Sequence, residues 1–401
     1  MIAGCGSPTP TEPPKPKVVA SLVAKSGERW GFIDTSGTYK IEPKFDQAHT
    51  FSEDQAAVEF GDLWGFIDKT GAVTIDPVYK KIADFSDGMA AVVDDYKWGF
   101  IDNKGKLVVP CQFKQVAPFS DDCAGVMKDD KWGFVDKTGV MIIPAKYDEV
   151  GQFVDGLAPF KSNGKWGYVD KTGKEVVAPT YGDAQKFTEG FAPVFQDGQW
   201  GFIDHDCTMI IHPRFEKVWP FHDKMAEVRS NGHVGFVDQA GVLTVKEDFE
   251  SREQFSEHRG LLESEGRWGY LDDKGAHVIP AKFDEAHDFC DGRAVVRVKG
   301  KYGYIDPTGK IVIPAQFVHA ESFKDGEAAV AVSVQDLDAI KDAASKADAT
   351  KGTAPAKGAD ATANGTEAKT AAPAKGADAT ANGTDAKTAA PAKGADPAKA
   401  H

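Results

Sequence analysis

Hydrophobic and polar residues recur along the chain with a period of 34 residues, and within each period they alternate as in β-strands. Residues 30–34, Trp-Gly-Phe-Ile-Asp, place large side chains on one face and Gly or an aliphatic residue on the other, which predicts a strand. Asp34 and Gly37 then stand at the first and fourth positions of a predicted tight turn. A second strand ends near Pro43, because Pro has no N–H to donate to a neighbouring strand.

A third strand precedes each Trp and contains the pattern Ala-x-Val, as at residues 90–92. It is joined to the Trp strand by dipeptides such as Asn163-Gly164, which favour hairpin turns. The predicted unit is therefore a three-stranded antiparallel meander. The link to the next unit, typified by residues 283–289, carries two aromatic residues and is expected to be one helical turn or a compact loop.

The period repeats nine times without an insertion, so neighbouring units are expected to stack by one repeated operation. Val234 and Tyr302 occupy the first position in two copies. Trp occupies it in the other seven: Trp30, Trp64, Trp98, Trp132, Trp166, Trp200 and Trp268. Phe stands 21 residues later in every copy: Phe51, Phe85, Phe119, Phe153, Phe187, Phe221, Phe255, Phe289 and Phe323. We predict that both sets form the structural core of the repeats.

A period of this length also suits tetratricopeptide helix pairs, but the turn Gly and two-residue alternation in each copy, and a Pro in every copy except the seventh, exclude them. A closed β-propeller-like ring is the alternative, although its blades usually have four strands and roughly 40 to 45 residues. Residues 18–24 already supply the first unit with a leading strand, and residues 328–332 supply a surplus strand at the far end. We therefore expect an all-β open superhelix of solenoid type rather than a ring.

Composition divides the chain into three parts: an N-terminal segment 1–17, one continuous repeat domain 18–335, and a low-complexity tail 336–401 of Ala, Lys, Gly, Asp, Thr and Pro. The tail has too few apolar residues to offset backbone ordering, so it is expected to be disordered. From Asp338 onward it carries nine Lys and eight acidic residues, which leaves almost all of the net charge of −14 on the repeats. An acidic body argues against nucleic acid as a partner.

Residues 2–5, Ile-Ala-Gly-Cys, resemble a bacterial lipoprotein processing site, in which Cys5 becomes the lipidated N-terminus. The Pro- and Thr-rich segment that follows is similar to a tether. No basic or apolar segment precedes the site, so the expected leader would lie further upstream or have been trimmed. The sequence has no stretch of about 18 apolar residues. We therefore expect an exported protein, on the periplasmic or surface face of the cell envelope, whose membrane link is a lipid anchor.

Three features invite a chemical interpretation, and each has a simpler structural one. The Asp after each Trp strand is explained by its position at the start of a turn. The repeated Trp could form an aromatic ladder for sugars, but the adjoining Gly favours core packing. Repeat six collects Cys207, His205, His212, His222 and His233 beside Asp204 and Asp206, but their spacing matches no metal-ligand signature, so no metal site is predicted.

The other cysteines, Cys111, Cys123, Cys207 and Cys290, occupy different repeat positions and give no disulfide framework. Cys111 and Cys123 share one unit and could pair, but free thiols are favoured. No phosphate loop, nucleophile elbow or zinc motif is present, so no cofactor and no catalytic residue is predicted.

The pattern Trp-Gly-Phe-Ile-Asp-x-x-Gly, then Ile-x-Pro-x-Phe-Asp and Phe-x-Asp-Gly-x-Ala-x-Val, resembles the WG (also called KWG) β-repeat family of bacterial proteins. The resemblance covers residues 18 to about 335 and implies a β-repeat architecture and frequent export, without functional residues to carry over. We expect a non-enzymatic interaction scaffold that binds a protein or an envelope polymer through an extended surface. The alternative is a carbohydrate- or cell-wall-binding module that uses exposed aromatic residues.

Overall fold

The computed structural model describes residues 27–222, 224–245, 251–272 and 276–337. The chain divides into a unit of residues 1–347 and a unit of residues 348–401, and the second lies wholly outside the described ranges. The leading strand expected at residues 18–24, the lipidation site at Cys5 and the expected disorder of the tail beyond Leu337 also fall outside them. The first two residues of the predicted tail are described, and Leu337 is buried in the core of the ring. Among the described residues, no helix is long and apolar enough to cross a membrane.

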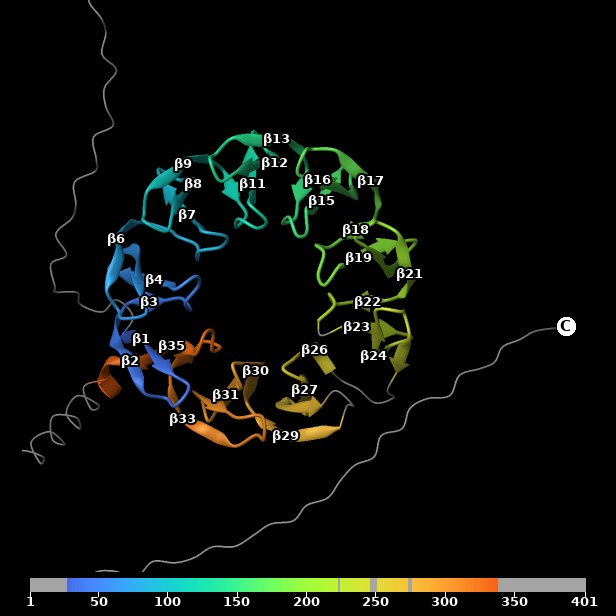
Figure 1. Cartoon of the computed structure of the whole chain (residues 1–401). Coiled ribbons are helices and arrows are strands. Elements are labelled where there is room, and N and C mark those ends of the chain that lie inside the picture. The colour runs from blue at the N-terminus through green and yellow to red at the C-terminus, as the bar shows by residue number, and fades with distance from the viewer. Residues whose placement is uncertain (1–26, 223, 246–250, 273–275, 338–401) are drawn as a thin grey trace, which may run out of the picture. The chain divides into compact units, whose positions relative to one another are not determined.

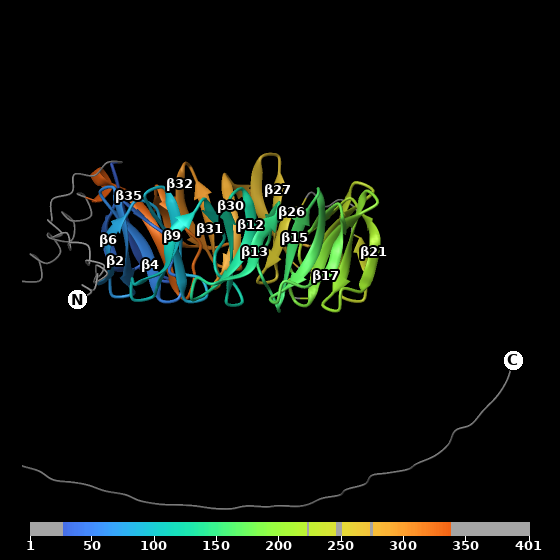
Figure 2. The ribbon, with the colours of Figure 1, turned by 90° about the horizontal axis from the view of Figure 1, so that it is seen from above.

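The described part of the first unit is all-β apart from one helical turn at residues 334–337, and it forms a closed ring of nine small antiparallel sheets, here called blades (Figure 1). Seen edge-on, the blades form a short cylinder with strands slanting along its axis (Figure 2). The expected order of Ala-x-Val strand, Trp strand and Ile/Val strand holds in every blade, as in β7-β8-β9. The three-stranded prediction is wrong for eight of the nine sheets, because a further strand pairs with the Ala-x-Val strand.

This additional strand lies in the link that was expected to be a helical turn or compact loop. The innermost strands of the blades are β3 (Gln47–Ala48), β10 (Gln115–Val116), β14 (Glu149–Val150), β18 (Asp183–Ala184), β22 (Lys217–Val218), β26 (Ser251–Ser256), β30 (Glu285–Cys290) and β34 (His319–Ala320). In the remaining blade the pairing is reduced to a single bridge between Ile82 and Val92.

The second strands, which carry Ala-x-Val, are β4 (Gln55–Phe60), β7 (Met89–Asp94), β11 (Cys123–Lys128), β15 (Leu157–Ser162), β19 (Phe191–Gln196), β23 (Met225–Ser230), β27 (Arg259–Ser264), β31 (Arg293–Val298) and β35 (Glu327–Ser333). The third strands, which begin near the repeated Trp, are β1 (Glu28–Asp34), β5 (Leu63–Asp68), β8 (Lys97–Asp102), β12 (Lys131–Asp136), β16 (Lys165–Asp170), β20 (Gln199–Asp204), β24 (His233–Asp238), β28 (Arg267–Asp272) and β32 (Lys301–Ile305). The outermost strands are β2 (Tyr39–Phe45), β6 (Val73–Tyr79), β9 (Leu107–Phe113), β13 (Met141–Tyr147), β17 (Glu175–Tyr181), β21 (Met209–Phe215), β25 (Leu243–Val245), β29 (His277–Phe283) and β33 (Ile311–Phe317).

The ring closes by pairing the two ends of the repeat array in one sheet, β34-β35-β1-β2, here called the seam blade (Figure 1). Strand β35 pairs with β1 along its whole length, from Glu28 opposite Ser333 to Asp34 opposite Glu327. The open superhelix and the solenoid are therefore wrong, and the alternative of a closed propeller-like ring is confirmed. The strand at residues 328–332 is not surplus, since it supplies the partner that β1 would otherwise lack.

The Gly after each Trp is required by a bulge between the third and fourth strands. The pairing register shifts between Trp132 and Phe134, which lets the two backbones approach closely. A Cβ atom on Gly133 would lie 2.4 Å from the carbonyl oxygen of Ile143, well inside contact distance. All nine copies carry Gly here, and the backbone clash explains why.

The hydrophobic core lies between blades rather than within one. In the eight copies whose link Phe side chain is described, that Phe packs against the aromatic residue two positions after the first residue of the preceding repeat, as Phe153 does with Phe134 at 4.6 Å between ring centroids. The contact is repeated at the seam, where Phe323 lies 4.8 Å from Tyr304. Burial of each such aromatic side chain contributes about 1.5–3 kcal/mol, so these contacts hold neighbouring blades together at the eight junctions where they are described.

A candidate ligand pocket at the seam of the ring

The Asp residues at the turn starts serve the architecture, as the sequence predicts. The Asp68 carboxylate accepts backbone N–H bonds from Thr70 at 2.9 Å and Ala72 at 3.0 Å. The Thr70 hydroxyl donates to the same oxygen at 2.6 Å, and this bond is the main reason that the pKa of Asp68 lies below its usual value. The ring of carboxylates is therefore engaged in turns.

The Phe residues of the predicted core are buried in the eight copies whose side chains are described, with Phe119 and Phe153 at 0 % exposure. Phe255 lies outside the described side chains.

The Trp rings are half-buried rather than enclosed. Each lies at the edge of an inter-blade cluster, as Trp132 does at the cluster that contains Phe153 and Phe160. They contribute to packing and still present an edge or face to solvent.

The histidines and cysteine of repeat six do not assemble into a site. The His205 ring nitrogen Nε2 lies 2.7 Å from the carbonyl oxygen of Asp155, in an inter-blade contact. Cys207 stands where other copies have the turn Gly and adopts a φ of 60°. Among the described residues, no group of three or more His, Cys, Asp or Glu could hold a metal ion.

The cysteines of the described region have free thiols, including Cys111 and Cys123, which could have paired. Burial raises the pKa of the Cys123 thiol to about 11, which leaves little reactive thiolate at neutral pH. Burial also raises the pKa of the Cys111, Cys207 and Cys290 thiols, so none of the four described thiols has the lowered pKa of a catalytic nucleophile.

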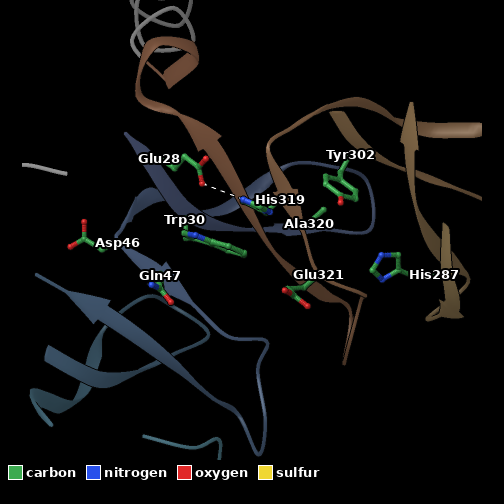
Figure 3. Close-up of a pocket in the computed structure, with 9 residues that line it drawn as sticks. All are labelled: Glu28, Trp30, Asp46, Gln47, His287, Tyr302, His319, Ala320 and Glu321. Atoms are coloured by element: carbon green, nitrogen blue, oxygen red, sulfur yellow. Dashed lines mark ion pairs between the residues drawn. The ribbon is translucent and has the colours of Figure 1, made fainter. Parts of the chain in front are cut away.

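A cavity of about 370 Å³ lies where blades meet at the seam, and it is here called the seam pocket (Figure 3). It is lined by Glu28, Trp30, Asp46, Gln47, His287, Tyr302, His319, Ala320 and Glu321. These residues come from the seam blade and from the blades on either side of it. Glu28 begins β1, and Asp46 follows the end of the antiparallel strand β2. These two positions lie at the same edge of the blade, so the pocket lies on one face of the ring.

Three rings of the seam pocket form a stack. His319 lies nearly parallel to Trp30, with 6.0 Å between ring centroids and 6° between planes. Tyr302, from the preceding blade, lies 6.5 Å from His319 on a plane inclined by 25°. Flat π-faces bind cations and the apolar faces of sugars, so this lining is suited to holding a ligand.

The lining also carries three carboxylates. Asp46 is buried and forms an ion pair with Arg29. Glu28 lies 3.5 Å from Nε2 of His319, and Glu321 is exposed at the other side of the Trp30 ring (Figure 3). The Glu321 backbone is held in place because its carbonyl oxygen accepts a 2.8 Å hydrogen bond from the Tyr304 hydroxyl.

Sequence reasoning identified Trp30 but missed the pocket, because it treated all copies as equivalent. The usable signal was the residue 29 positions after the first residue of each repeat. The last copy has Ala331 at this position. The other eight copies have a larger side chain there: Glu59, Val93, Met127, Lys161, Phe195, Arg229, Glu263 and Arg297. Residue 331 lies opposite both Trp30 and His319 in the sheet, so its size decides whether the space beside the Trp ring is filled.

Comparison with protein families finds that the model described as "WG containing repeat" matches residues 30–64, 64–98, 98–132, 132–166, 166–200, 200–232, 268–302 and 302–332. These matches cover well over half of the chain. The copy that begins at Val234 is not matched between residues 232 and 268, in line with its departures from the pattern. No curated protein matches the chain.

Among solved structures, the chain is similar to "Crystal structure of the eukaryotic initiation factor", with a TM-score of 0.52 and 11% identity over 76% of this chain and 98% of that one. At this identity the likeness shows the fold alone. The structure "Dihydro-heme d1 dehydrogenase NirN in complex with DHE" has a TM-score of 0.39 and 12% identity over 65% of this chain and 75% of its own. PorZ of Porphyromonas gingivalis has a TM-score of 0.29 and 11% identity over 72% of this chain and 50% of its own.

Proposed function

Because the chain belongs to the family of proteins built from WG-containing repeats, whose repeated residues here serve the architecture, we propose that it is a non-enzymatic interaction scaffold. Its partner is a protein with a basic surface. The observation that carries this proposal is the seam pocket, where rings and carboxylates converge at the one blade built from both ends of the array. Such a lining binds a ligand by ring contact and charge, and the negative charge of the repeats attracts basic partners.

The full chain, fluorescently labelled, would be applied to an array of peptides of equal length whose net charge runs from acidic to basic. Binding should increase with the number of Lys and Arg residues and weaken as salt rises, because attraction between exposed charges is screened. Indifference to peptide charge, or binding strengthened by salt, would refute the proposal.

A carbohydrate- or cell-wall-binding role is the second candidate. The half-buried Trp rings and the Gln47 amide in the seam pocket favour it, since stacked rings and amide groups recognise sugars. The same labelled protein on an array of neutral oligosaccharides separates the two functions. Salt-insensitive retention of glycans, with no preference among the peptides, would establish this role in place of the first.

We also propose export and anchoring to the cell envelope through Cys5, on the strength of the residues 2–5 pattern. Expression behind a lipoprotein signal sequence should place the protein in the detergent phase, and Cys5→Ser should move it to the aqueous phase. Equal partitioning of the two forms would show that the pattern is coincidental.

A further inference from the structure

In two blades, a basic side chain lies against the aromatic residue at the first position of the repeat. The equivalent residue in the seam blade is Trp30, which lines the seam pocket. In β15 and β16, Lys161 lies opposite Trp166, with its Nζ 5.6 Å from the ring centroid. Glu149 of the neighbouring strand β14 lies opposite Lys161 and forms a 2.6 Å ion pair with it. The three side chains form one row across the blade, in the order acid, cation and aromatic ring.

The blade next to the seam repeats this row with different residues. Arg297 lies opposite Tyr302, with its guanidinium carbon 5.7 Å from the ring centroid. Glu285 lies opposite Arg297 at 3.4 Å and also accepts a 2.8 Å hydrogen bond from the Tyr302 hydroxyl. Both an ammonium and a guanidinium group therefore fit this position of the fold.

The seam blade has the aromatic side chain, Trp30, but lacks the basic residue opposite it. Its row is His319, Ala331 and Trp30, so a methyl group stands where the other two rows have Lys or Arg. The seam pocket opens beside the Trp30 face, with the Glu28 and Glu321 carboxylates at its wall.

We propose that the seam pocket binds a lysine or arginine side chain of a partner protein, which takes the place that Lys161 and Arg297 occupy in their own blades. This assignment deepens the proposed function and rests on it for the source of the ligand. The ammonium or guanidinium group lies against the Trp30 face, and the carboxylates of Glu28 and Glu321 balance its charge. The alkyl stem packs along the rings of the stack, as long basic side chains do on apolar surfaces.

The occupant is a cation because of the charges at the wall. Asp46 is neutralised by Arg29, whereas Glu321 lies exposed and projects into the pocket region beside Trp30 (Figure 3). An anionic ligand would meet these carboxylates with like charge. A neutral sugar would contact the same rings and gain nothing from the acidic wall, which gives the test its matched comparison.

The test uses the full chain with N-α-acetyl-lysine methylamide as the probe and its N-ε-acetylated form as the neutral control. Binding is followed by NMR at the Trp30 indole N–H, assigned with Trp30→Phe. The charged probe should bind with a dissociation constant on the order of millimolar, and the neutral form should bind at least about tenfold more weakly. Equal binding of both forms, or no shift of the Trp30 signal, would overturn the proposal.

Ala331→Lys is the decisive variant, because it should fill the pocket from within by the geometry of Lys161 and abolish probe binding without removing a lining residue. Should it fail to fold, Glu321→Gln serves instead, since this exposed change keeps the pocket and should weaken binding about two- to fivefold. Unchanged affinity in a folded Ala331→Lys variant, or in Glu321→Gln, would contradict the assignment.

Lys161→Ala provides the reciprocal experiment. It should open an equivalent pocket beside Trp166, with Glu149 as its carboxylate, and add a second probe site reported by the Trp166 indole. Failure of the folded variant to gain that site would refute the argument from the three rows.

The two proposals fail separately. Probe binding at Trp30 without any charge preference on the peptide array would leave the pocket standing and remove the basic protein partner. Basic peptides that bind wild type and folded Ala331→Lys equally would keep the scaffold function and remove the seam pocket from it.

Discussion

Gly37 of the seam blade packs against Ile313 of the preceding blade, where a Cβ on the glycine would lie 3.1 Å from Cγ2 of the isoleucine. The same pairing joins Gly71 to Ile41 at 3.2 Å within the array. The junction that closes the ring is therefore packed like the junctions along it. Because this contact joins residues from opposite ends of the array, closure turns an otherwise local repeat into one cooperative structure.

Removal of the closing strands should destabilise the whole ring. Truncation before His319 deletes β34 and β35 and leaves β1 paired with β2 alone, so thermal unfolding should occur at a clearly lower temperature and over a broader range. Truncation after Leu337 is the control, since it retains every strand pair of the ring. Scanning calorimetry of both forms provides the measurement. Equal melting temperatures would show that the seam adds no stability.

Gly133→Ala should be strongly destabilising, because the added Cβ would meet the Ile143 carbonyl oxygen at 2.4 Å and the backbones must separate. We expect a loss of about 1–3 kcal/mol or more in the free energy of unfolding, measured by urea denaturation. Gly156→Asp is the control: it stands at a position where the chain already has Asp122 with a φ of 63°, and a Cβ there meets nothing within 4 Å. A control that costs as much as Gly133→Ala would remove the close-approach explanation.

Phe153→Ala should cost more stability than Trp132→Ala, although Trp is the larger residue. Phe153 is fully buried between two blades, whereas the Trp132 ring is half-buried at the edge of the same cluster. We expect about 3–5 kcal/mol for Phe153→Ala and about 2–3 kcal/mol for Trp132→Ala, measured by chemical denaturation. The reverse order would mean that the Trp ring, rather than the Phe stack, holds the blades together.

Stability should depend on pH through His49, whose Nδ1 lies 2.7 Å from Oδ1 of Asp84 in the next blade. This hydrogen bond raises the pKa of His49 above its ordinary value of 6.5. A group with a raised folded pKa contributes its full stabilisation below the unfolded pKa, and the contribution is lost as pH rises through the folded pKa. The unfolding free energy of wild type relative to His49→Gln should therefore be largest below the ordinary pKa of 6.5 and should decline as pH rises through the raised pKa of folded His49.

The measurement is a set of urea denaturation curves at closely spaced pH values, with NMR titration of His49 as a direct reading of its pKa. The effect should be modest because both side chains are more than one-third exposed. Asp84→Asn, which removes the charge and keeps the size, should abolish most of the difference. An advantage of wild type that grows with pH would contradict the assigned shift.

Most of the local structure was predictable because each element depends on residues close together in sequence. The Asp68 turn, the Asn163-Gly164 hairpin and the strand at Trp132 all follow from side-chain alternation and turn chemistry within one repeat. The short innermost strands were missed, because two residues such as Glu149 and Val150 carry no periodic signal. They are recognised as a strand only because they pair with the neighbouring strand β15.

The seam pocket was not predicted for a related reason. Trp30, Ala331 and His319 become neighbours through strand pairing between the two ends of the array. The exchange of a large side chain for Ala331 is visible in the repeat alignment, but it has meaning only when β35 is known to lie beside β1.

By itself, the sequence determined a nine-fold, all-β array with Phe rings at its core, since spacing and alternation specify strands and their buried faces. Only the tertiary structure decided that the array is a ring. Closure depends on the angle between successive blades, and this angle is set by how the rings of one blade, such as Phe134, pack on those of the next, such as Phe153. A small rotation added at each of nine junctions separates an open superhelix from a closed ring, and no single repeat carries enough information to specify that sum.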